Sequence, residues 1–129
     1  MPDQVTAVSN DTTAHWIAAA RARESERADR LFDDPHAAVL AGRRGRAALV
    51  ASEGATGGEN EFLPIRTRFF DDVLRTAVDR LEQVVLLGAG LDTRAFRLAR
   101  RASSSLSKVV TRAPRGRVPN AGPILGRAM

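Results

Sequence analysis

The residues best suited to chemistry lie in one short stretch, QVVLLGAGLDTR, at residues 83–94. Its first part, residues 84–87, is an unbroken apolar run rich in β-branched side chains, which is typical of a strand buried on both faces of a parallel sheet. Gly88 and Gly90 end that run. A buried strand, a glycine turn and the start of a helix together bring bare backbone and helix N–H groups against a nucleotide-like ligand.

The residues after the glycines distinguish between two classes of ligand. A dinucleotide site uses a G-x-G-x-x-G spacing, because the third glycine lets the helix approach the pyrophosphate closely. Here Leu91, Asp92 and Thr93 follow Gly90, so the third position is not small, and Asp92 would repel a phosphate. A ligand without a pyrophosphate, such as S-adenosylmethionine, has less need of that glycine. Glycines at such a turn also serve tight packing alone, and the pattern by itself leaves both interpretations open.

Two helices are expected to position this turn. Residues 64–81 carry apolar side chains at spacings of three and four, which predicts a core-facing helix leading into the strand. The members of that stripe are Ile65, Phe69, Phe70, Val73, Leu74, Ala77, Val78 and Leu81. Residues 91–98 continue as the first two turns of a further helix, with Asp92 near its N-terminus, where a carboxylate is favoured.

The region before residue 62 is expected to be helical only in part. Residues 14–30 are rich in helix formers and predict a helix capped by Asp11 or Thr13, with a solvated charged face. A short second helix should begin at Pro35, capped by Asp33 or Asp34, and stop at Gly42. Residues 42–61 contain five glycines and predict mainly a surface loop, with at most one helical turn at residues 47–51.

Four motifs, HWIAAARARES, RLFDDP, IRTRFFDD and QVVLLGAGLDTRAFRL, resemble a known family over about residues 13–98. That family is the S-adenosylmethionine-dependent methyltransferases related to leucine carboxyl methyltransferase. The resemblance implies an α/β fold: the N-terminal fragment of a doubly wound, Rossmann-like methyltransferase domain. Its parts would be N-terminal helices, the first strand and the first helix, followed by a mostly disordered tail.

The resemblance also implies the position of the cofactor, S-adenosyl-L-methionine. Gly88, Ala89 and Gly90 would lie under its methionine portion, with Asp92 beside them. In the family an acid about 20 residues past the glycines binds the ribose hydroxyls, and this sequence has no acid after Asp92. No catalytic residue is assigned, and the chain alone is expected to be inactive.

An arginine before the first strand is implied to pair with the carboxylate of the cofactor. Arg68 is the candidate for this role and Arg66 is the runner-up. For either arginine, an ordinary ion pair on a helix surface with Asp72 or Glu61 is the competing interpretation.

Basic residues concentrate at the C-terminal end of the chain. The net charge is +5, yet the last 37 residues carry nine basic side chains and no acid. We therefore divide the chain into the methyltransferase part, 1–98, and a basic low-complexity tail, 99–129, in which only residues 108–111 resemble a strand. Either the tail is the frameshifted end of a GC-rich reading frame, or it is a basic arm that binds nucleic acid or anionic surfaces. The alternative function is accordingly a basic-tailed binding module without catalysis.

The remaining composition limits the function classes. The 129 residues include no cysteine and no long apolar run, which predicts a cytoplasmic protein with no membrane association. His15 and His36 lack neighbouring ligands that would suggest a metal site. The expected partner is a small-molecule methyl acceptor of unknown identity, and nucleic acid is not favoured because the basic tail has no aromatic residue for base stacking.

Overall fold

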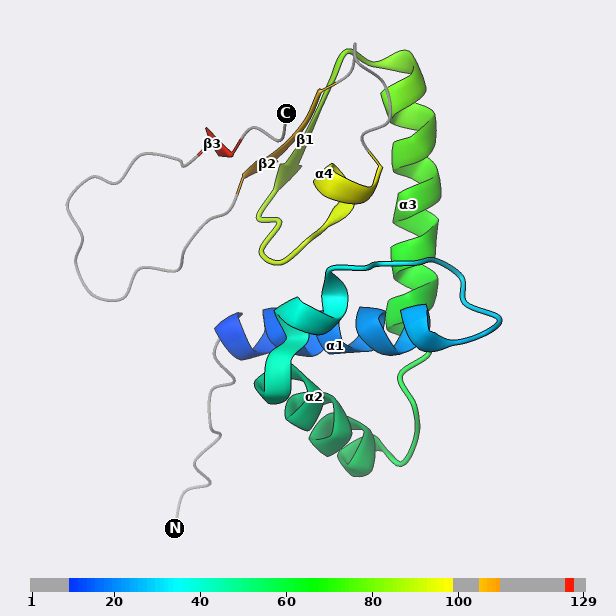
Figure 1. Cartoon of the computed structure of the whole chain (residues 1–129), viewed down its shortest axis with the longest axis vertical. Helices are drawn as coiled ribbons and strands as arrows, with labels where there is room; N and C mark the ends of the chain where they lie inside the picture. Colours follow the sequence, from blue (N-terminus) through cyan, green and yellow to red (C-terminus); the bar gives the residue numbers. More distant parts are fainter. Residues whose placement is uncertain (1–9, 99–104, 110–124, 127–129) are drawn as a thin grey trace, which may run out of the picture.

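The computed structural model describes residues 10–98, 105–109 and 125–126. Its elements are, in order, α1 (Asn10–Glu26), α2 (Ala37–Thr56), α3 (Phe62–Arg80), β1 (Gln83–Leu87), α4 (Arg94–Arg97), β2 (Ser105–Val109) and β3 (Leu125–Gly126). Figure 1 shows α1 and α2 as a helical layer at one end, from which α3 extends along a small sheet. The described part is mostly helical, with a short α/β unit following α3.

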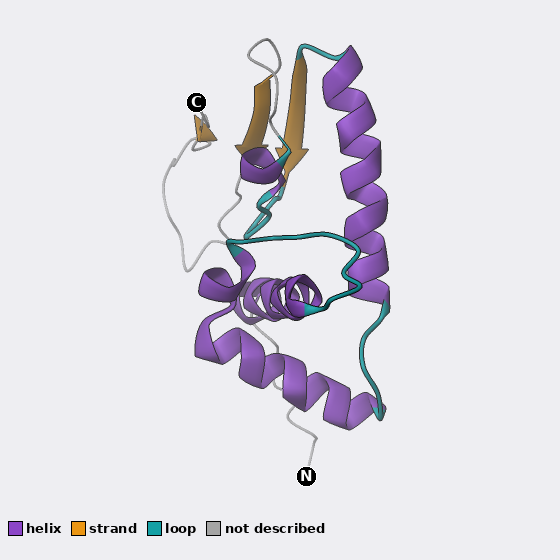
Figure 2. Cartoon of the chain, turned by 45° about the vertical axis from the view of Figure 1, so that its right-hand side comes forward, coloured by secondary structure: helices purple, strands orange, loops and turns teal. Residues whose placement is uncertain are grey.

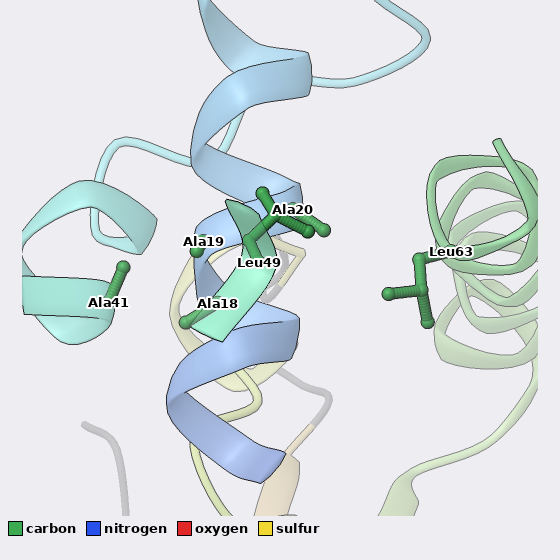
Figure 3. Close-up of a cluster of buried hydrophobic side chains, with 6 residues drawn as sticks. All are labelled: Ala18, Ala19, Ala20, Ala41, Leu49 and Leu63. Carbon is green, nitrogen blue, oxygen red and sulfur yellow. The ribbon is translucent and has the colours of Figure 1, made fainter. Parts of the chain in front are cut away.

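Small side chains bring α1 and α2 into close contact. The buried cluster in Figure 3 consists of Ala18, Ala19, Ala20, Ala41, Leu49 and Leu63, with Leu63 pointing from α3 toward α1. Gly45 of α2 is buried against α1, and a Cβ added to it would lie 2.3 Å from the carbonyl oxygen of His15. Nδ1 of His15 lies 2.6 Å from the carbonyl oxygen of Leu40. The backbones of α1 and α2 are therefore in close contact at this point.

The first predicted helix is confirmed over most of its length, but its ends and its surroundings differ. Asp11 and Thr13 lie inside the first turn of α1 and do not precede it, and the helix ends four residues before residue 30. The prediction of a solvated charged face is wrong, because Arg21 and Glu24 are buried. The physical reason is that the chain after α1 folds back over this face.

The second helix is much longer than the sequence predicts. It begins at Ala37, two residues after the start predicted at Pro35, and its N-cap is His36, with no side-chain cap hydrogen bond. The predicted cap by Asp33 or Asp34 is therefore wrong: Asp34 accepts a hydrogen bond at 3.1 Å from the N–H of His36, before the helix begins. Gly42, with φ 56° and ψ −168°, bends the helix without ending it. The chain remains helical to Thr56, and the prediction of a loop over residues 42–61 is wrong for all but residues 57–61.

The reason for this error is that glycine has three different roles in this segment. Gly42 makes the bend, Gly45 permits close packing and Gly57, with φ 79°, forms the left-handed cap that ends α2. Buried Ala41 and Leu49 provide the apolar contacts that keep the segment helical. The number of glycines alone does not distinguish a helix with such glycines from a loop.

The third helix is confirmed, although it has two apolar faces. Its buried residues are Leu63, Pro64, Thr67, Asp71 and Leu74. Its exposed apolar residues are Phe62, Ile65, Phe69, Phe70 and Val73. The expectation of a core-facing stripe is therefore wrong for Ile65, Phe69, Phe70 and Val73, and also for Leu81, which follows the helix and is 54% exposed. Figure 2 shows α3 running alongside the sheet. The residues of α3 that meet other elements are Leu63, in the cluster with α1, and Asp71, which binds Arg94 and Arg97 of α4. Phe70 is 46% exposed although its ring lies 5.9 Å from the guanidinium of Arg94.

The predicted strand is confirmed as β1, and it pairs in parallel with β2, from Gln83 opposite Ser105 to Leu87 opposite Val109. The helix α4 lies between them in sequence, which makes a β-α-β unit. β3 pairs antiparallel with β2. The expectation that β1 is buried on both faces is wrong, because Val85 and Leu87 are 46% and 79% exposed. Within the described residues, β2 is the strand that pairs with β1.

Much of the predicted tail lies outside the described residues. The strand predicted at residues 108–111 is found at Ser105–Val109, and Val110 and Thr111 are outside the described part. The expectation of disorder concerns residues that are likewise mostly outside it. In the described ranges, no helix combines the length and apolar character needed to cross a bilayer.

Candidate functional site

The glycine turn predicted after the strand is present, and its two glycines have an unusual backbone conformation. Gly88 and Gly90 have φ angles of 60° and 50°, in the left-handed region that favours glycine. The N–H of Asp92 donates to the carbonyl oxygen of Ala89 at 2.8 Å and closes the turn. A Cβ added to Gly88 would meet nothing within 4 Å, so the backbone there is open to a ligand.

The side chain of Asp92 is used within the turn. Its Oδ1 accepts a hydrogen bond from the N–H of Arg94 at 2.8 Å, and its Oδ2 forms an ion pair with Nη1 of Arg94. Asp92 thus supports the start of α4 from just before the helix. The helix itself covers only Arg94–Arg97, so the prediction of two turns over residues 91–98 is wrong. Its carboxylate is engaged by Arg94.

A second carboxylate, Asp34, lies beneath the turn and is 2% exposed. Its Oδ2 accepts hydrogen bonds from Oγ1 of Thr93 at 2.6 Å and from Nε of Arg21 at 2.9 Å. Nη2 of Arg21 in turn donates to the carbonyl oxygen of Leu91 at 2.7 Å. The N–H of Asp34 donates to Oγ of Ser25 at 2.9 Å, which fixes this segment against α1.

The third carboxylate, Asp71 of α3, is fully buried and holds α4. Nε of Arg94 donates to its Oδ1 at 2.7 Å, and Nη1 of Arg97 donates to its Oδ2 at 2.8 Å. Nη2 of Arg94 also lies 3.4 Å from the carbonyl oxygen of Thr67. Two arginines one helical turn apart are therefore both paired with one acid from α3.

The charges in this cluster balance. Its members, which we call the turn cluster, are Arg21, Asp34, Asp71, Asp92, Arg94 and Arg97. Burial by itself would raise the pKa of Asp34, but the hydrogen bond from Thr93 and the charges of Arg21 and Arg97 outweigh it and lower this pKa. Asp34 is therefore held as an anion, and each arginine of the turn cluster has a carboxylate partner.

Arg68, the predicted partner of the cofactor carboxylate, lies on α3 at the edge of this arrangement. Its Nε donates to Oδ2 of Asp72 at 2.8 Å, and its Nη1 donates to the carbonyl oxygen of Leu31 at 2.7 Å. The hydrogen bond with Asp72 raises the pKa of Arg68. The pairing with Asp72 is the competing interpretation given by the sequence, while the side chain stays 46% exposed. Arg66 is also exposed on α3.

Of the turn cluster, only Asp92 is predicted as a site residue from the sequence. The sequence predicts Asp34 only as a helix cap and assigns no role to Asp71, which is buried next to the exposed Asp72. Arg94 and Arg97, three residues apart on one helix face, were a sign of a shared acidic partner. The partner itself is 23 residues or more away in sequence and could not be identified.

A groove lies elsewhere, between the end of α1 and the start of α3. Its lining includes Arg23, Arg27, Leu31, Pro64 and Ile65, and no residue of the glycine turn contributes to it. His15 and His36, which were considered for a metal site, take part in packing. His15 contacts α2, and the ring of His36 lies edge-on to that of Phe96 at 5.9 Å.

Residues 14–109 match the leucine carboxyl methyltransferase family. The matched residues include the whole turn cluster and both of the paired strands, β1 and β2. The chain belongs to this family. The match extends 11 residues past the boundary predicted at residue 98.

Three relatives, each named an S-adenosyl-L-methionine-dependent methyltransferase, show how much of the family's length is present. A protein of Frankia alni is 46% identical over 105 residues, which are 75% of this chain and 36% of the relative. One of a Parafrankia species is 46% identical over 102 residues, 73% of this chain and 32% of the relative. One of Streptomyces coelicolor is 39% identical over 120 residues, 79% of this chain and 39% of the relative. The chain thus spans about a third of the length of these curated relatives.

Proposed function

We propose that this chain carries the cofactor-binding turn of an S-adenosyl-L-methionine-dependent methyltransferase that methylates an oxygen atom of a small molecule. The observation that carries this proposal is the pair of left-handed glycines directly after β1, within the matched family region. When bound, the cofactor supplies a methyl group on a sulfonium for transfer to the acceptor. In this proposal the described α/β unit begins a doubly wound sheet.

The residues present fit the methionine end of the cofactor. Gly88 has open space where a side chain would stand, so the backbone of Gly88, Ala89 and Gly90 can approach a ligand closely. Arg68 is half-exposed and carries a guanidinium that can pair with the cofactor carboxylate, in exchange for its present contact with Asp72. No described residue is assigned to the chemical step.

The chain on its own is proposed to be inactive in methyl transfer. The reaction needs acceptor, methyl and sulfur held in line in a site that excludes water. Within the described residues, β1 has exposed side chains, and the turn lies open. Binding of the cofactor, and not turnover, is therefore the property to test first.

The test is a calorimetric titration of S-adenosylhomocysteine into the full chain and two glycine variants. Gly88→Val should weaken binding at least about tenfold, because valine is strained at positive φ and covers the open backbone. Gly57→Val is the matched control, since Gly57 also has positive φ and open space but caps α2 far from the turn in sequence. Absence of heat at millimolar ligand for the wild type, or equal weakening in both variants, would refute the proposed site.

The role of Arg68 needs a separate comparison. Arg75 also pairs with Asp72, at 2.8 Å, and is similarly exposed, so Arg75→Gln matches Arg68→Gln in charge and in partner. Arg68→Gln should weaken S-adenosylhomocysteine but not methylthioadenosine, which lacks the amino acid portion. Arg75→Gln should change neither affinity. If Arg68→Gln lost equal affinity for both ligands, Arg68 would have no role beyond its surface ion pair with Asp72.

The concentration of positive charge after Thr93 supports one other candidate function, a basic arm that binds nucleic acid. Salt-dependent retention on immobilised DNA should then disappear when the chain is truncated after Leu98. Unchanged retention would exclude the arm. Translation of the gene past codon 98 in the other two frames tests the alternative origin of this segment, because a frameshift predicts a strand ending in an acid there.

A further inference from the structure

Asp34 is connected to the residues on both sides of Asp92, directly after Gly88 and Gly90, although it precedes these glycines by more than 50 residues. On one side, the hydroxyl of Thr93 donates to it directly at 2.6 Å. On the other side, Arg21 binds Asp34 and also the carbonyl oxygen of Leu91. One buried carboxylate thus fixes the residues before and after Asp92.

The use of Thr93 is unusual for its position. Thr93 is the N-cap of α4, where a threonine side chain ordinarily accepts a hydrogen bond from a helix N–H. Here the side chain makes no such bond, and the N–H of Arg94 is satisfied by Asp92. The Thr93 hydroxyl instead donates to Asp34 and accepts from Nε of Arg97 at 3.0 Å. It therefore links the turn to the buried acid and contributes no cap to its own helix.

We propose that Asp34 is a positioning residue for the cofactor turn, and that it acts through Thr93 and Arg21. The inference rests on the proposed function, because it assigns Asp34 the task of holding the glycine backbone ready for the cofactor. Glycines with positive φ have many accessible conformations, so a turn built on them needs outside contacts to stay in one arrangement. Asp34 supplies these contacts from a segment packed on α1, and the chain binds ligand without first ordering the turn.

The experiment compares two buried threonines. Thr93→Val removes the hydroxyl that binds Asp34 and keeps the side-chain shape. Thr67→Val is the matched control, because Thr67 is also buried and its hydroxyl donates only within α3, to the carbonyl oxygen of Leu63 at 2.9 Å. Amide hydrogen exchange by NMR measures the order of residues 88–93, and calorimetry measures the affinity for S-adenosylhomocysteine.

We expect Thr93→Val to accelerate exchange in the turn and to weaken binding about tenfold, the effect of losing one buried hydrogen bond. Thr67→Val should change neither. Thr93→Ser keeps the hydroxyl and should bind like the wild type. Arg21→Lys keeps the charge but cannot hold both Asp34 and Leu91, so it should resemble Thr93→Val and provides the test if that variant does not fold.

The outcomes separate this inference from the proposed function. Equal changes in Thr93→Val and Thr67→Val would reduce the role of Asp34 to general stability and would overturn the inference. Wild-type binding with unchanged affinity in Thr93→Val would overturn it as well, while the proposed function would stand. A wild-type chain that binds no S-adenosylhomocysteine would overturn both.

Discussion

The guanidinium of Arg97 donates two hydrogen bonds to the carboxylate of Asp71, at 2.8 and 3.1 Å, and joins α4 to α3. Asp71 is fully buried, and Arg94 binds the same carboxylate. Asp71→Asn leaves two arginines facing a neutral amide. We therefore expect the free energy of unfolding to fall by about 3–5 kcal/mol, as for other broken buried ion pairs. Urea denaturation at pH 7 measures it.

The neighbouring acid gives the control for this prediction. Asp72→Asn makes the same chemical change one residue away, but Asp72 is half-exposed and pairs with the exposed Arg68 and Arg75. Water screens such pairs, so the free energy of unfolding should change little. Equal losses in the two variants would show that Asp71 is not the buried partner of Arg94 and Arg97.

The contact between α1 and α2 predicts opposite effects for two glycine substitutions. A Cβ at Gly45 would lie 2.3 Å from the carbonyl oxygen of His15, so Gly45→Ala must push the helices apart, at a cost of about 1–3 kcal/mol. Gly54, also in α2, has nothing within 4 Å of an added Cβ. Gly54→Ala should stabilise the chain by about 0.5–1 kcal/mol through helix propensity.

Thermal unfolding followed by circular dichroism distinguishes the two outcomes. The melting temperature should fall for Gly45→Ala and rise for Gly54→Ala. A rise in both would mean that Gly45 is not in close contact with the backbone of α1, and that the two helices pack farther apart than described.

The strand and the glycine turn could be predicted from sequence because each is encoded by adjacent residues. The apolar run forms β1, and Gly88 and Gly90, which can adopt positive φ, form the turn after it. The helix α3 follows from its apolar spacing in the same way. In each case the signal lies within a few residues of the structure it specifies.

The turn cluster and the packing faces could not be predicted, because they depend on contacts between distant segments. Asp34 and Thr93 are 59 residues apart, and the sequence around either residue does not identify the other as its partner. For α3, the apolar spacing predicts one core-facing stripe but does not show which of its residues are buried and which stay exposed. In α2, the same residue type both bends the helix, at Gly42, and permits its packing, at Gly45. Only the fold assigns these roles.

Acid should destabilise the chain through carboxylates whose pKa is lowered in the folded state. Burial would raise the pKa of Glu53, but hydrogen bonds from Arg23 and from the N–H of Asn60 lower it; the pKa of Asp34 is lowered as well. A lowered folded pKa means that the stabilisation is complete above the unfolded pKa, about 4. It is lost as the pH falls through the folded pKa. Stability should therefore decline below about pH 4–5.

Urea denaturation at several pH values between 7 and 3 tests this decline. Glu53→Gln removes one of the responsible groups, so its stability should be lower at pH 7 but should fall less steeply in acid. Glu26→Gln, at the exposed end of α1, is the control and should follow the wild-type curve. A wild-type slope in Glu53→Gln would exclude Glu53 as a source of the acid sensitivity.

The buried and exposed apolar residues of α3 predict that truncating a buried leucine destabilises the chain more than truncating a larger, exposed phenylalanine. Leu74 is 9% exposed on the packed face, and Leu74→Ala should lower the free energy of unfolding by about 2–4 kcal/mol through the lost contacts and the cavity. Phe69 is 61% exposed on the other face. Phe69→Ala removes a larger side chain but little buried area, and alanine favours the helix, so the loss should stay below about 1 kcal/mol. Urea denaturation of both variants decides between the faces, since a greater loss for Phe69→Ala would show that the face described as exposed is the packed one.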